Sequence, residues 1–151
     1  LHYHAITTVY LRYAQAVKLP APLTGFADGT AQWVLHRGAL GLPDNEVAVV
    51  ISVSDYTEAW KDKDLAEKIH ADIKRVCPDL DKPEAIRIIT EKRATTAATV
   101  DFVQPDFSWL HHRRIYPAGD YLHPRYPATL EATVQSGFAA AEKLMLDLRF
   151  E

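Results

Sequence analysis

The sequence predicts an α+β fold, in which a mostly antiparallel sheet is covered by a middle helix and a long C-terminal helix. Several short runs of β-branched and aromatic residues carry apolar side chains at every second position, which is typical of strands. Short connections join these runs and favour antiparallel pairing, because parallel strands need long crossovers. Two longer segments repeat apolar residues every three or four positions, as amphipathic helices do.

Four strands are predicted in the first part of the chain. They cover residues 5–13, 31–37, 47–53 and 84–94. The segment between the first two is predicted to be a loop, because proline lacks a backbone donor and glycine tolerates unusual dihedral angles; it contains Pro20, Pro22, Gly25 and Gly29. A fifth, short strand is predicted over 114–118, after an irregular stretch.

The two helices are predicted over 61–77 and 130–148. In the first, Asp62 and Asp64 occupy the first turn, where the helix dipole favours negative charge, and Pro78 ends the helix. The second helix carries one apolar stripe, formed by Leu130, Val134, Phe138, Ala141, Met145 and Leu148.

The composition narrows the classes of partner. The chain has 151 residues, enough for one ordinary domain, and its 48% hydrophobic and 25% charged residues are typical of folded globular proteins. Its formal net charge of −3 gives no attraction for a phosphate backbone, so no nucleic-acid partner is expected. No apolar run reaches the roughly 18 residues of a membrane-spanning helix.

The segment 115–141 carries the most chemistry. A predicted strand ends in Gly119-Asp120, and a proline-containing loop then leads to a helix that Thr129 can cap. The free N–H groups at such a helix end can bind an anion, and a nearby carboxylate can accept hydrogen bonds from sugar hydroxyls. An ordinary capped helix explains the same residues, so physical reasoning alone leaves both interpretations open.

This segment resembles the C-terminal FAD motif of the amine oxidase and phytoene desaturase superfamily. That motif consists of an apolar strand, Ala-Gly-Asp, a Pro-Ala-Thr loop, Glu-Gly-Ala and a Ser-Gly pair one turn later. Looser similarities point to the squalene-associated branch, the hydroxysqualene dehydroxylases. They are Thr8-Val-Tyr-Leu, Leu19-Pro-Ala-Pro, Gln32-Trp-Val, Arg37-Gly38 and Glu91-Lys-Arg-Ala-Thr95.

The resemblance implies a set of FAD-binding residues. Gly119 and Asp120 are expected to contact the ribityl and diphosphate part, and Thr129, Leu130 and Glu131 to direct a helix N-terminus at the flavin ring. The sequence departs from the family at Ala132, where glycine is usual, so the added methyl group is expected to crowd the cofactor.

The other half of the FAD site is missing from the sequence. No G-x-G-x-x-G motif follows a predicted strand, so the resemblance implies that an N-terminal Rossmann FAD domain lies outside this chain. Residues 1–112 then form a substrate-binding α+β domain, and 113–151 form the strand-loop-helix of the FAD motif. The chain alone is expected to be inactive.

The resemblance implies that the full-length protein acts on a squalene-type isoprenoid, either converting hydroxysqualene to squalene or desaturating such a chain. A flavin amine oxidase, a carotenoid desaturase and a freestanding lipid-binding module remain alternatives. The expected location is the cytoplasm, with peripheral contact to the inner membrane. The isolated chain is expected to self-associate through the face that would cover the missing FAD domain.

Individual residues outside the FAD motif give weaker indications. Arg93 and Trp33 are candidates for substrate binding, although a solvated charge and a core aromatic explain them equally well. No catalytic residue is identified. A metal site is not expected, because the chain has a single cysteine and no H-E-x-x-H spacing, although His111, His112 and His123 lie near the Gly-Asp loop.

Overall fold

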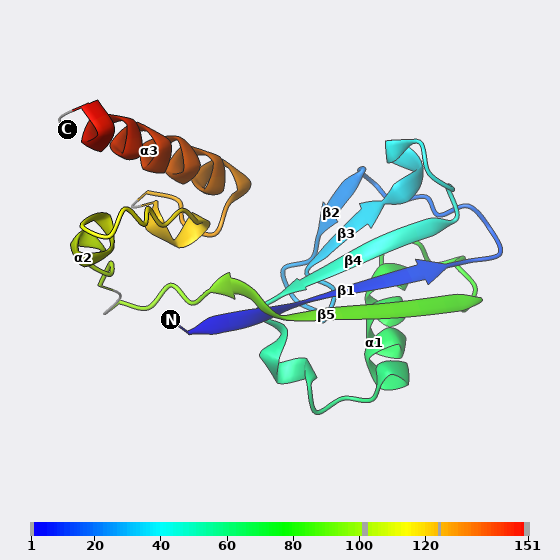
Figure 1. The fold of residues 1–151 in the computed structure, drawn as a ribbon. Helices are drawn as coiled ribbons and strands as arrows, with labels where there is room; N and C mark the ends of the chain where they lie inside the picture. Colours follow the sequence, from blue (N-terminus) through cyan, green and yellow to red (C-terminus); the bar gives the residue numbers. More distant parts are fainter. Residues whose placement is uncertain (1, 101–102, 124, 150–151) are drawn as a thin grey trace. The chain divides into compact units, whose positions relative to one another are not determined.

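The computed structural model describes residues 2–100, 103–123 and 125–149, which form two compact units (Figure 1). The first unit is Tyr3–Thr95, and the second begins at Thr96 and includes His2. The domain boundary that the resemblance implies, at 112/113, falls within the second unit.

A five-stranded antiparallel sheet forms the first unit. Its strand order is β2-β3-β4-β1-β5. The strands are β1 Tyr3–Arg12, β2 Leu23–Gly25, β3 Trp33–His36, β4 Glu46–Ser52 and β5 Ala85–Thr96. The expected α+β class, with an antiparallel sheet, a middle helix and a long C-terminal helix, is confirmed, and the C-terminal helix belongs to the second unit.

The alternation of side chains along the strands gives the sheet two different faces. On β1, which lies between β4 and β5, the buried residues are Ala5, Thr7, Val9 and Leu11. Val9 lies opposite Val49 of β4, which in turn lies opposite Val34 of β3, so three fully buried valines form one row across the sheet. Because side chains alternate with a period of two, the residues between them point to the other face.

The helix α1 (Asp62–Lys74) packs against the valine face. Leu65, Ile69 and Ile73 recur at helical spacing and are buried in one core with these strands. Asp72, near the end of the helix, accepts hydrogen bonds from the backbone amides of Thr30 and Ala31 at 2.7 and 2.9 Å. The apolar periodicity of α1 thus gives the unit its core, and Asp72 fixes the loop before β3 to the helix.

The opposite face of the sheet keeps apolar side chains at the surface, and we refer to it as the open face. Its residues follow the register in which Trp33 pairs with Val50, which pairs with Thr8. Trp33 and Ile89 on this face are nearly half exposed. The remaining members are partly covered by their neighbours: Ile6, Thr8, Tyr10, Leu35 and Val50.

The second unit contains the short helix α2 (Ser108–His111), the 3₁₀ turn η3 (Asp120–Leu122) and the helix α3 (Leu130–Arg149). The helix α3 packs against η3. No described helix is both long enough and apolar enough to cross a membrane.

Two of the predictions about strands were wrong, and the stretch predicted to be irregular contains the short helix α2. The segment 18–30 contains the short strand β2, which pairs with β3 although proline and glycine surround it. The predicted strand 114–118 belongs to no sheet among the described residues. Arg114 adopts the left-handed conformation, with φ of 60°, and Pro117 has no amide to donate, so neither residue supports a regular ladder.

Candidate functional site

The Gly119-Asp120 turn is fixed by hydrogen bonds of Gly119. Its amide donates to Oγ of Ser136 at 2.8 Å, and its carbonyl accepts from the amide of Leu122 at 3.2 Å. Both backbone groups of Gly119 are therefore used within the chain. A Cβ atom at position 119 would lie 2.5 Å from the Tyr121 ring, so glycine allows this ring to cover the turn.

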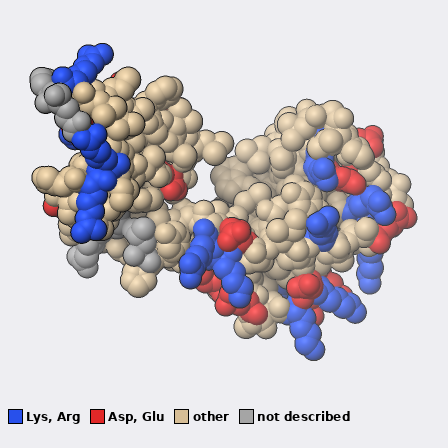
Figure 2. Space-filling model, viewed as in Figure 1, with Lys and Arg blue, Asp and Glu red and all other residues tan. Residues whose placement is uncertain are grey.

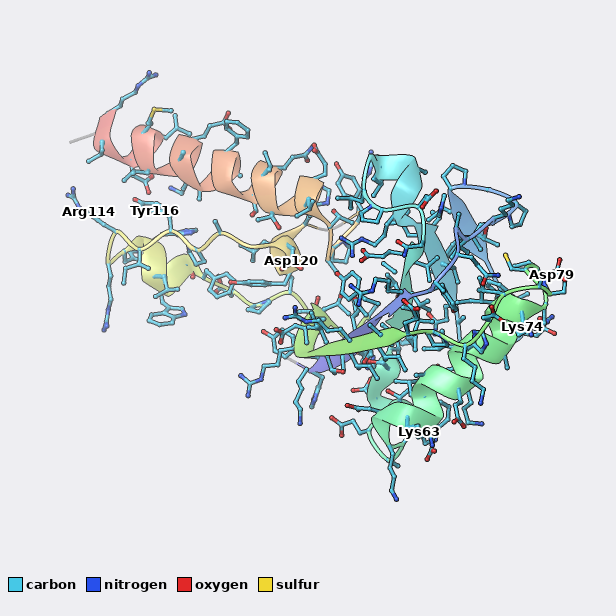
Figure 3. All side chains as sticks on the ribbon, turned by 90° about the vertical axis from the view of Figure 1, so that its right-hand side faces the viewer. Lys63, Lys74, Asp79, Arg114, Tyr116 and Asp120 are labelled. Carbon is cyan, nitrogen blue, oxygen red and sulfur yellow. The ribbon has the colours of Figure 1, made fainter. Side chains whose placement is uncertain are left out.

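Asp120 begins η3 and is partly exposed (Figure 3). Its carboxylate makes no hydrogen bond or ion pair with any described residue, whereas its backbone carbonyl accepts from the amide of His123. A carboxylate accepts hydrogen bonds through both oxygens. Of the predicted site residues, Asp120 therefore offers an acceptor that can bind the hydroxyl groups of a ligand.

Thr129 caps the helix α3, as predicted. Its Oγ1 accepts a hydrogen bond from the amide of Ala132 at 3.1 Å and donates to the carbonyl of Tyr126 at 2.9 Å. The preceding Ala128 has a positive φ of 62°, an unfavourable conformation for a residue with a side chain. The hydrogen bonds of Thr129 hold this turn and so direct the N-terminus of α3.

The first turn of α3 presents backbone donors. Leu130 is 88% exposed, and the amides of Leu130 and Glu131 have no hydrogen-bond partner among the described residues. The Glu131 carboxylate is engaged along the helix, where it accepts from the Gln135 side chain at 2.6 Å. Two amides and the positive end of the helix dipole therefore remain available to an anion or a carbonyl oxygen.

Ala132, the departure from the family motif, is 0% exposed. Its methyl group is therefore covered by atoms of this chain and is not presented at the surface beside Leu130. Ser136, one helical turn later on the same side, is also buried and binds Gly119. This side of α3 holds the Gly119-Asp120 turn.

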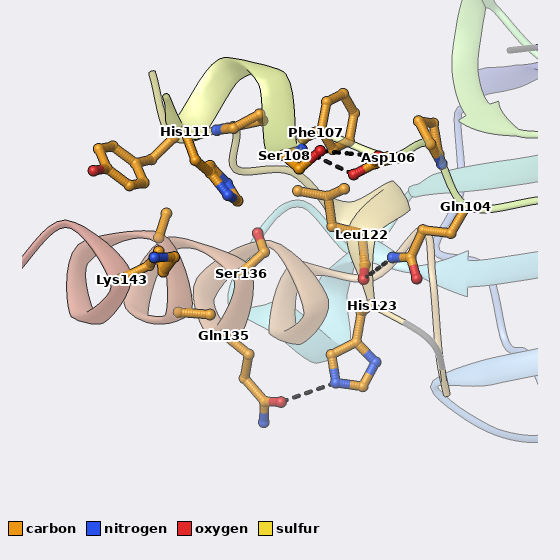
Figure 4. Close-up of a pocket in the computed structure, with 15 residues that line it drawn as sticks. Gln104, Asp106, Phe107, Ser108, His111, Leu122, His123, Gln135, Ser136 and Lys143 are labelled. Carbon is orange, nitrogen blue, oxygen red and sulfur yellow. Dashed lines mark hydrogen bonds between the residues drawn. The ribbon is translucent and has the colours of Figure 1, made fainter. Parts of the chain in front are cut away.

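A cavity of about 690 Å³ lies between the α2 segment and α3 in the same unit (Figure 4). Phe107, His111, Leu122, Ser136 and Lys143 are among its lining residues. The His123 ring bonds Gln135 at 3.0 Å, and the Gln104 side chain donates to the Leu122 carbonyl. The mixture of apolar and polar groups can hold a small organic ligand.

Asp106, which lines this cavity, and Asp147, which bonds the lining residues Tyr116 and Lys143, are hydrogen-bond acceptors. The Ser108 amide, at 2.9 Å, and the Ser108 hydroxyl lower the pKa of Asp106. Hydrogen bonds from Lys143 and Tyr116 lower the pKa of Asp147. Both groups are therefore ionised at neutral pH, and neither can donate a proton as a general acid there.

The structure does not bring the two predicted substrate residues together. Trp33 is on β3, whereas Arg93 is on β5, and β4 and β1 separate these strands. The Thr90 hydroxyl of β5 lies 2.9 Å from the Thr7 hydroxyl of β1, and Arg93 follows three residues later on β5, beside β1. Trp33 is on the open face and 49% exposed, so it lies outside the core of the first unit.

Sequence reasoning missed Ser136 as the residue that holds the Gly119 turn. A signal was present, because the family motif includes a Ser-Gly pair at this position. It also missed the contacts of Tyr116, whose hydroxyl donates to Asp147 at 2.8 Å and whose ring stacks on His111. No sequence pattern links these side chains, because they come from different segments.

Comparison with known proteins gives the family context. Two hydroxysqualene dehydroxylases are similar to this chain. The protein of Zymomonas mobilis is 29% identical over 150 residues, which is 93% of this chain and 32% of that protein. The protein of Rhodopseudomonas palustris is 31% identical over 147 residues, which is 95% of this chain and 33% of that protein. The chain thus spans about a third of the length of these relatives.

A solved structure shares the fold. A protein of Exiguobacterium sp. 255-15, provisionally assigned as a protoporphyrinogen oxidase, matches 93% of this chain with a TM-score of 0.57 and 16% identity, and the match covers 35% of that protein. The family model described as flavin containing amine oxidoreductase matches residues 1–145. The chain therefore belongs to the flavin-containing amine oxidoreductase family.

Proposed function

We propose that the full-length protein is an FAD-dependent oxidoreductase acting on a squalene-type isoprenoid. The reaction is the reductive conversion of hydroxysqualene to squalene, or the desaturation of such a chain. The similarity to two hydroxysqualene dehydroxylases over more than nine tenths of the chain carries this proposal. Membership of a flavin-containing family supports the choice of cofactor.

The residues of the C-terminal unit are chemically suited to part of FAD. Asp120 offers carboxylate oxygens to ribityl hydroxyls, and the amides of Leu130 and Glu131 offer donors to the pyrimidine edge of the flavin. Gly119 and Thr129 position these groups through their hydrogen bonds to Ser136 and Ala132. When bound, FAD would supply the hydride chemistry, and the Asp120 carboxylate with the Leu130 and Glu131 amides would orient it.

The open face of the sheet is suited to a long hydrocarbon. Trp33, Leu35, Val50 and Ile89 present apolar surface that is only partly covered within the unit. Burial of such surface by an isoprenoid contributes about 25 cal/mol per Å² of apolar area. We propose that this face forms one wall of the substrate site and that Trp33 contacts the substrate.

We also propose that this chain is inactive by itself. The relatives are about three times as long, and the chain has no G-x-G-x-x-G motif for the ADP half of the cofactor. The remaining part of the FAD site then belongs to an N-terminal Rossmann domain. A cytoplasmic protein that touches the inner membrane would meet a hydrocarbon substrate where it dissolves.

A chimera tests the proposed function. The matching third of the Zymomonas mobilis relative is replaced by this chain, and the product is assayed with FAD and hydroxysqualene. Squalene formation by the chimera, with none by the 151-residue chain alone, supports the proposal. Turnover of amines with release of hydrogen peroxide, or of carotenoid precursors, would instead identify one of the other flavoenzymes.

Asp120→Asn in the chimera tests the cofactor contact. We expect weaker FAD retention, because the neutral amide is a poorer acceptor for the ribityl hydroxyls. Asp79→Asn is the matched control, since Asp79 is an exposed aspartate of the other unit (Figure 3). Equal FAD content in the two variants would remove Asp120 from the proposed site.

A further inference from the structure

A second cavity, of about 540 Å³, lies on the open face of the sheet. Its lining includes Tyr10, Arg12, Arg37, Glu46, Arg87 and Ile89. The three arginines come from β1, the turn after β3, and β5, so the fold gathers them from separate segments. We refer to this cavity as the arginine pocket.

The register explains why these side chains share one face. Tyr10 and Arg12 alternate with the buried Val9 and Leu11 on β1, and Arg12 lies opposite Glu46 on β4. The other neighbour of β1 is β5. The amide of Glu84, the residue before β5, donates to the Arg12 carbonyl at 2.8 Å, which brings the start of β5 beside Arg12.

One arginine of the pocket is already paired. Arg37 donates to Glu46 at 2.7 Å, and its guanidinium lies 5.2 Å from the centre of the Tyr10 ring. Both members of this ion pair are more than two-thirds buried. The pair neutralises the one carboxylate in the lining and fixes Arg37 in place.

The other two arginines carry uncompensated charge. Arg12 and Arg87 are exposed and make no ion pair or hydrogen bond through their side chains with any described residue. The pocket therefore holds two positive charges in a chain whose net charge is −3. Figure 2 shows basic and acidic side chains side by side over the unit that contains the sheet.

Apolar side chains of the open face adjoin the charges on one side. Ile89 lines the pocket, and the open face continues from it along Thr8 and Val50 to Trp33. A ligand that matches both the arginines and the apolar open face carries an anionic group with several oxygens at one end and a hydrocarbon chain at the other. Arginine suits phosphate oxygens because its planar guanidinium can donate two parallel hydrogen bonds.

We propose that the arginine pocket binds the diphosphate group of a prenyl diphosphate, whose hydrocarbon chain lies along the open face. The choice of an isoprenoid chain rests on the proposed function, whereas the anion site rests on the arginines alone. A protein that processes neutral isoprenoids would through this site also bind the diphosphate esters from which such hydrocarbons are made by loss of diphosphate.

Calorimetric titration of the 151-residue chain at low ionic strength tests the site. Inorganic diphosphate is expected to bind, and geranyl diphosphate to bind more tightly than either inorganic diphosphate or geraniol. Arg12→Gln and Arg87→Gln are each expected to weaken diphosphate binding about tenfold, the loss of one charge-assisted contact. Arg149→Gln, which removes an exposed arginine from the other unit, is expected to leave it unchanged.

Glu46→Gln gives a change of opposite sign. It removes the negative charge that pairs with Arg37, so the net charge of the pocket rises by one. Diphosphate affinity is therefore expected to rise, a result that a misfolded variant cannot produce. The absence of diphosphate binding, or equal affinities for the wild type, Arg12→Gln and Arg87→Gln, would overturn the site. Geranyl diphosphate binding no more tightly than inorganic diphosphate would overturn the hydrocarbon part.

A vesicle assay separates the two sources of a phosphate group. Arginine-dependent binding to phosphatidate vesicles, without binding of soluble geranyl diphosphate, would overturn the prenyl assignment in favour of a lipid headgroup. None of these titrations uses FAD or turnover. Failure of the anion site therefore leaves the flavoenzyme proposal untouched, and an inactive chimera leaves the titrations valid.

Discussion

The amide of Gly119 donates a 2.8 Å hydrogen bond to the hydroxyl of Ser136, which joins the Gly-Asp turn to the middle of α3. Ser136→Ala leaves this partly buried amide without an acceptor. We expect a loss of about 1–3 kcal/mol in the unfolding free energy of the C-terminal unit. Urea denaturation measures it, and Ser136→Thr, which keeps a hydroxyl, is the control. Equal stability of the alanine variant would show that water replaces Ser136 at no cost.

Gly137 lies inside α3, and a Cβ atom there would meet no atom within 4 Å. Gly137→Ala is therefore expected to raise the stability of the isolated chain by about 1 kcal/mol, since alanine has the higher helix propensity.

In the chimera, we expect the same substitution to lower FAD content if the proposed Rossmann domain approaches α3 closely at this glycine. Unchanged FAD content would place that domain elsewhere.

Asp72 accepts hydrogen bonds from two consecutive amides, those of Thr30 and Ala31. Asp72→Ala removes both bonds and is expected to cost about 2–4 kcal/mol in the unfolding free energy. Asp72→Asn keeps an acceptor oxygen and should cost less. Chemical denaturation of both variants checks the order, and an alanine variant as stable as the asparagine variant would contradict it.

His70 gives the first unit a pH-dependent stability. Burial, followed by repulsion from Lys74 and Lys82, lowers its pKa below the usual value of 6.5. The unfolded chain therefore binds a proton more readily than the folded chain, and stability falls as pH drops from about 7 through 6.5 to the lower folded pKa. Asp55, Asp106 and Asp147 have lowered pKa values and lose their contributions only at more acidic pH.

Thermal unfolding between pH 7.5 and 5 measures this effect. The melting temperature of the wild type is expected to fall over this range. In the wild type, the Tyr13 hydroxyl lies 3.2 Å from Nδ1 of His70. His70→Gln keeps a side chain that can bond this hydroxyl but does not titrate, so it should flatten the profile. A profile of unchanged slope in His70→Gln would assign the pH dependence to other groups.

The apolar stripe of α3 predicts self-association of the isolated chain. Its large members are all more than half exposed: Leu130, Val134, Phe138, Met145 and Leu148. Light scattering at high concentration is expected to give a mass above that of the monomer. Replacement of Val134 and Phe138 by glutamine should restore the monomer, whereas Leu42→Gln in the first unit should not. A monomeric wild type would contradict the prediction.

Sequence patterns were sufficient for the long elements. β1, β4, β5, α1 and α3 were all predicted close to their observed positions, because their apolar periods are long enough to distinguish strand from helix. The strand β2 was missed because its three residues carry no period, and its pairing with β3 determines its conformation. The predicted strand 114–118 failed because alternation alone supplies no partner strand.

Some features of the candidate site could likewise be predicted from the sequence, and others could not. The cap at Thr129 followed from local rules, since a threonine bonds an amide only three residues away. The stripe on α3 identified a helix, but sequence could not tell which side contacts the chain; the structure buries Ala132 and Ser136 and exposes the stripe.

By itself, the sequence determined the class of fold, the long strands and helices, the family resemblance and the residues of the Gly-Asp motif. These depend on side chains close together in the chain, where spacing and propensity decide the local structure. Only the tertiary structure decided that Ser136 holds Gly119 and that Arg12, Arg37 and Arg87 share one pocket. Strand register and packing bring distant segments together, and no local pattern encodes which side chains then meet.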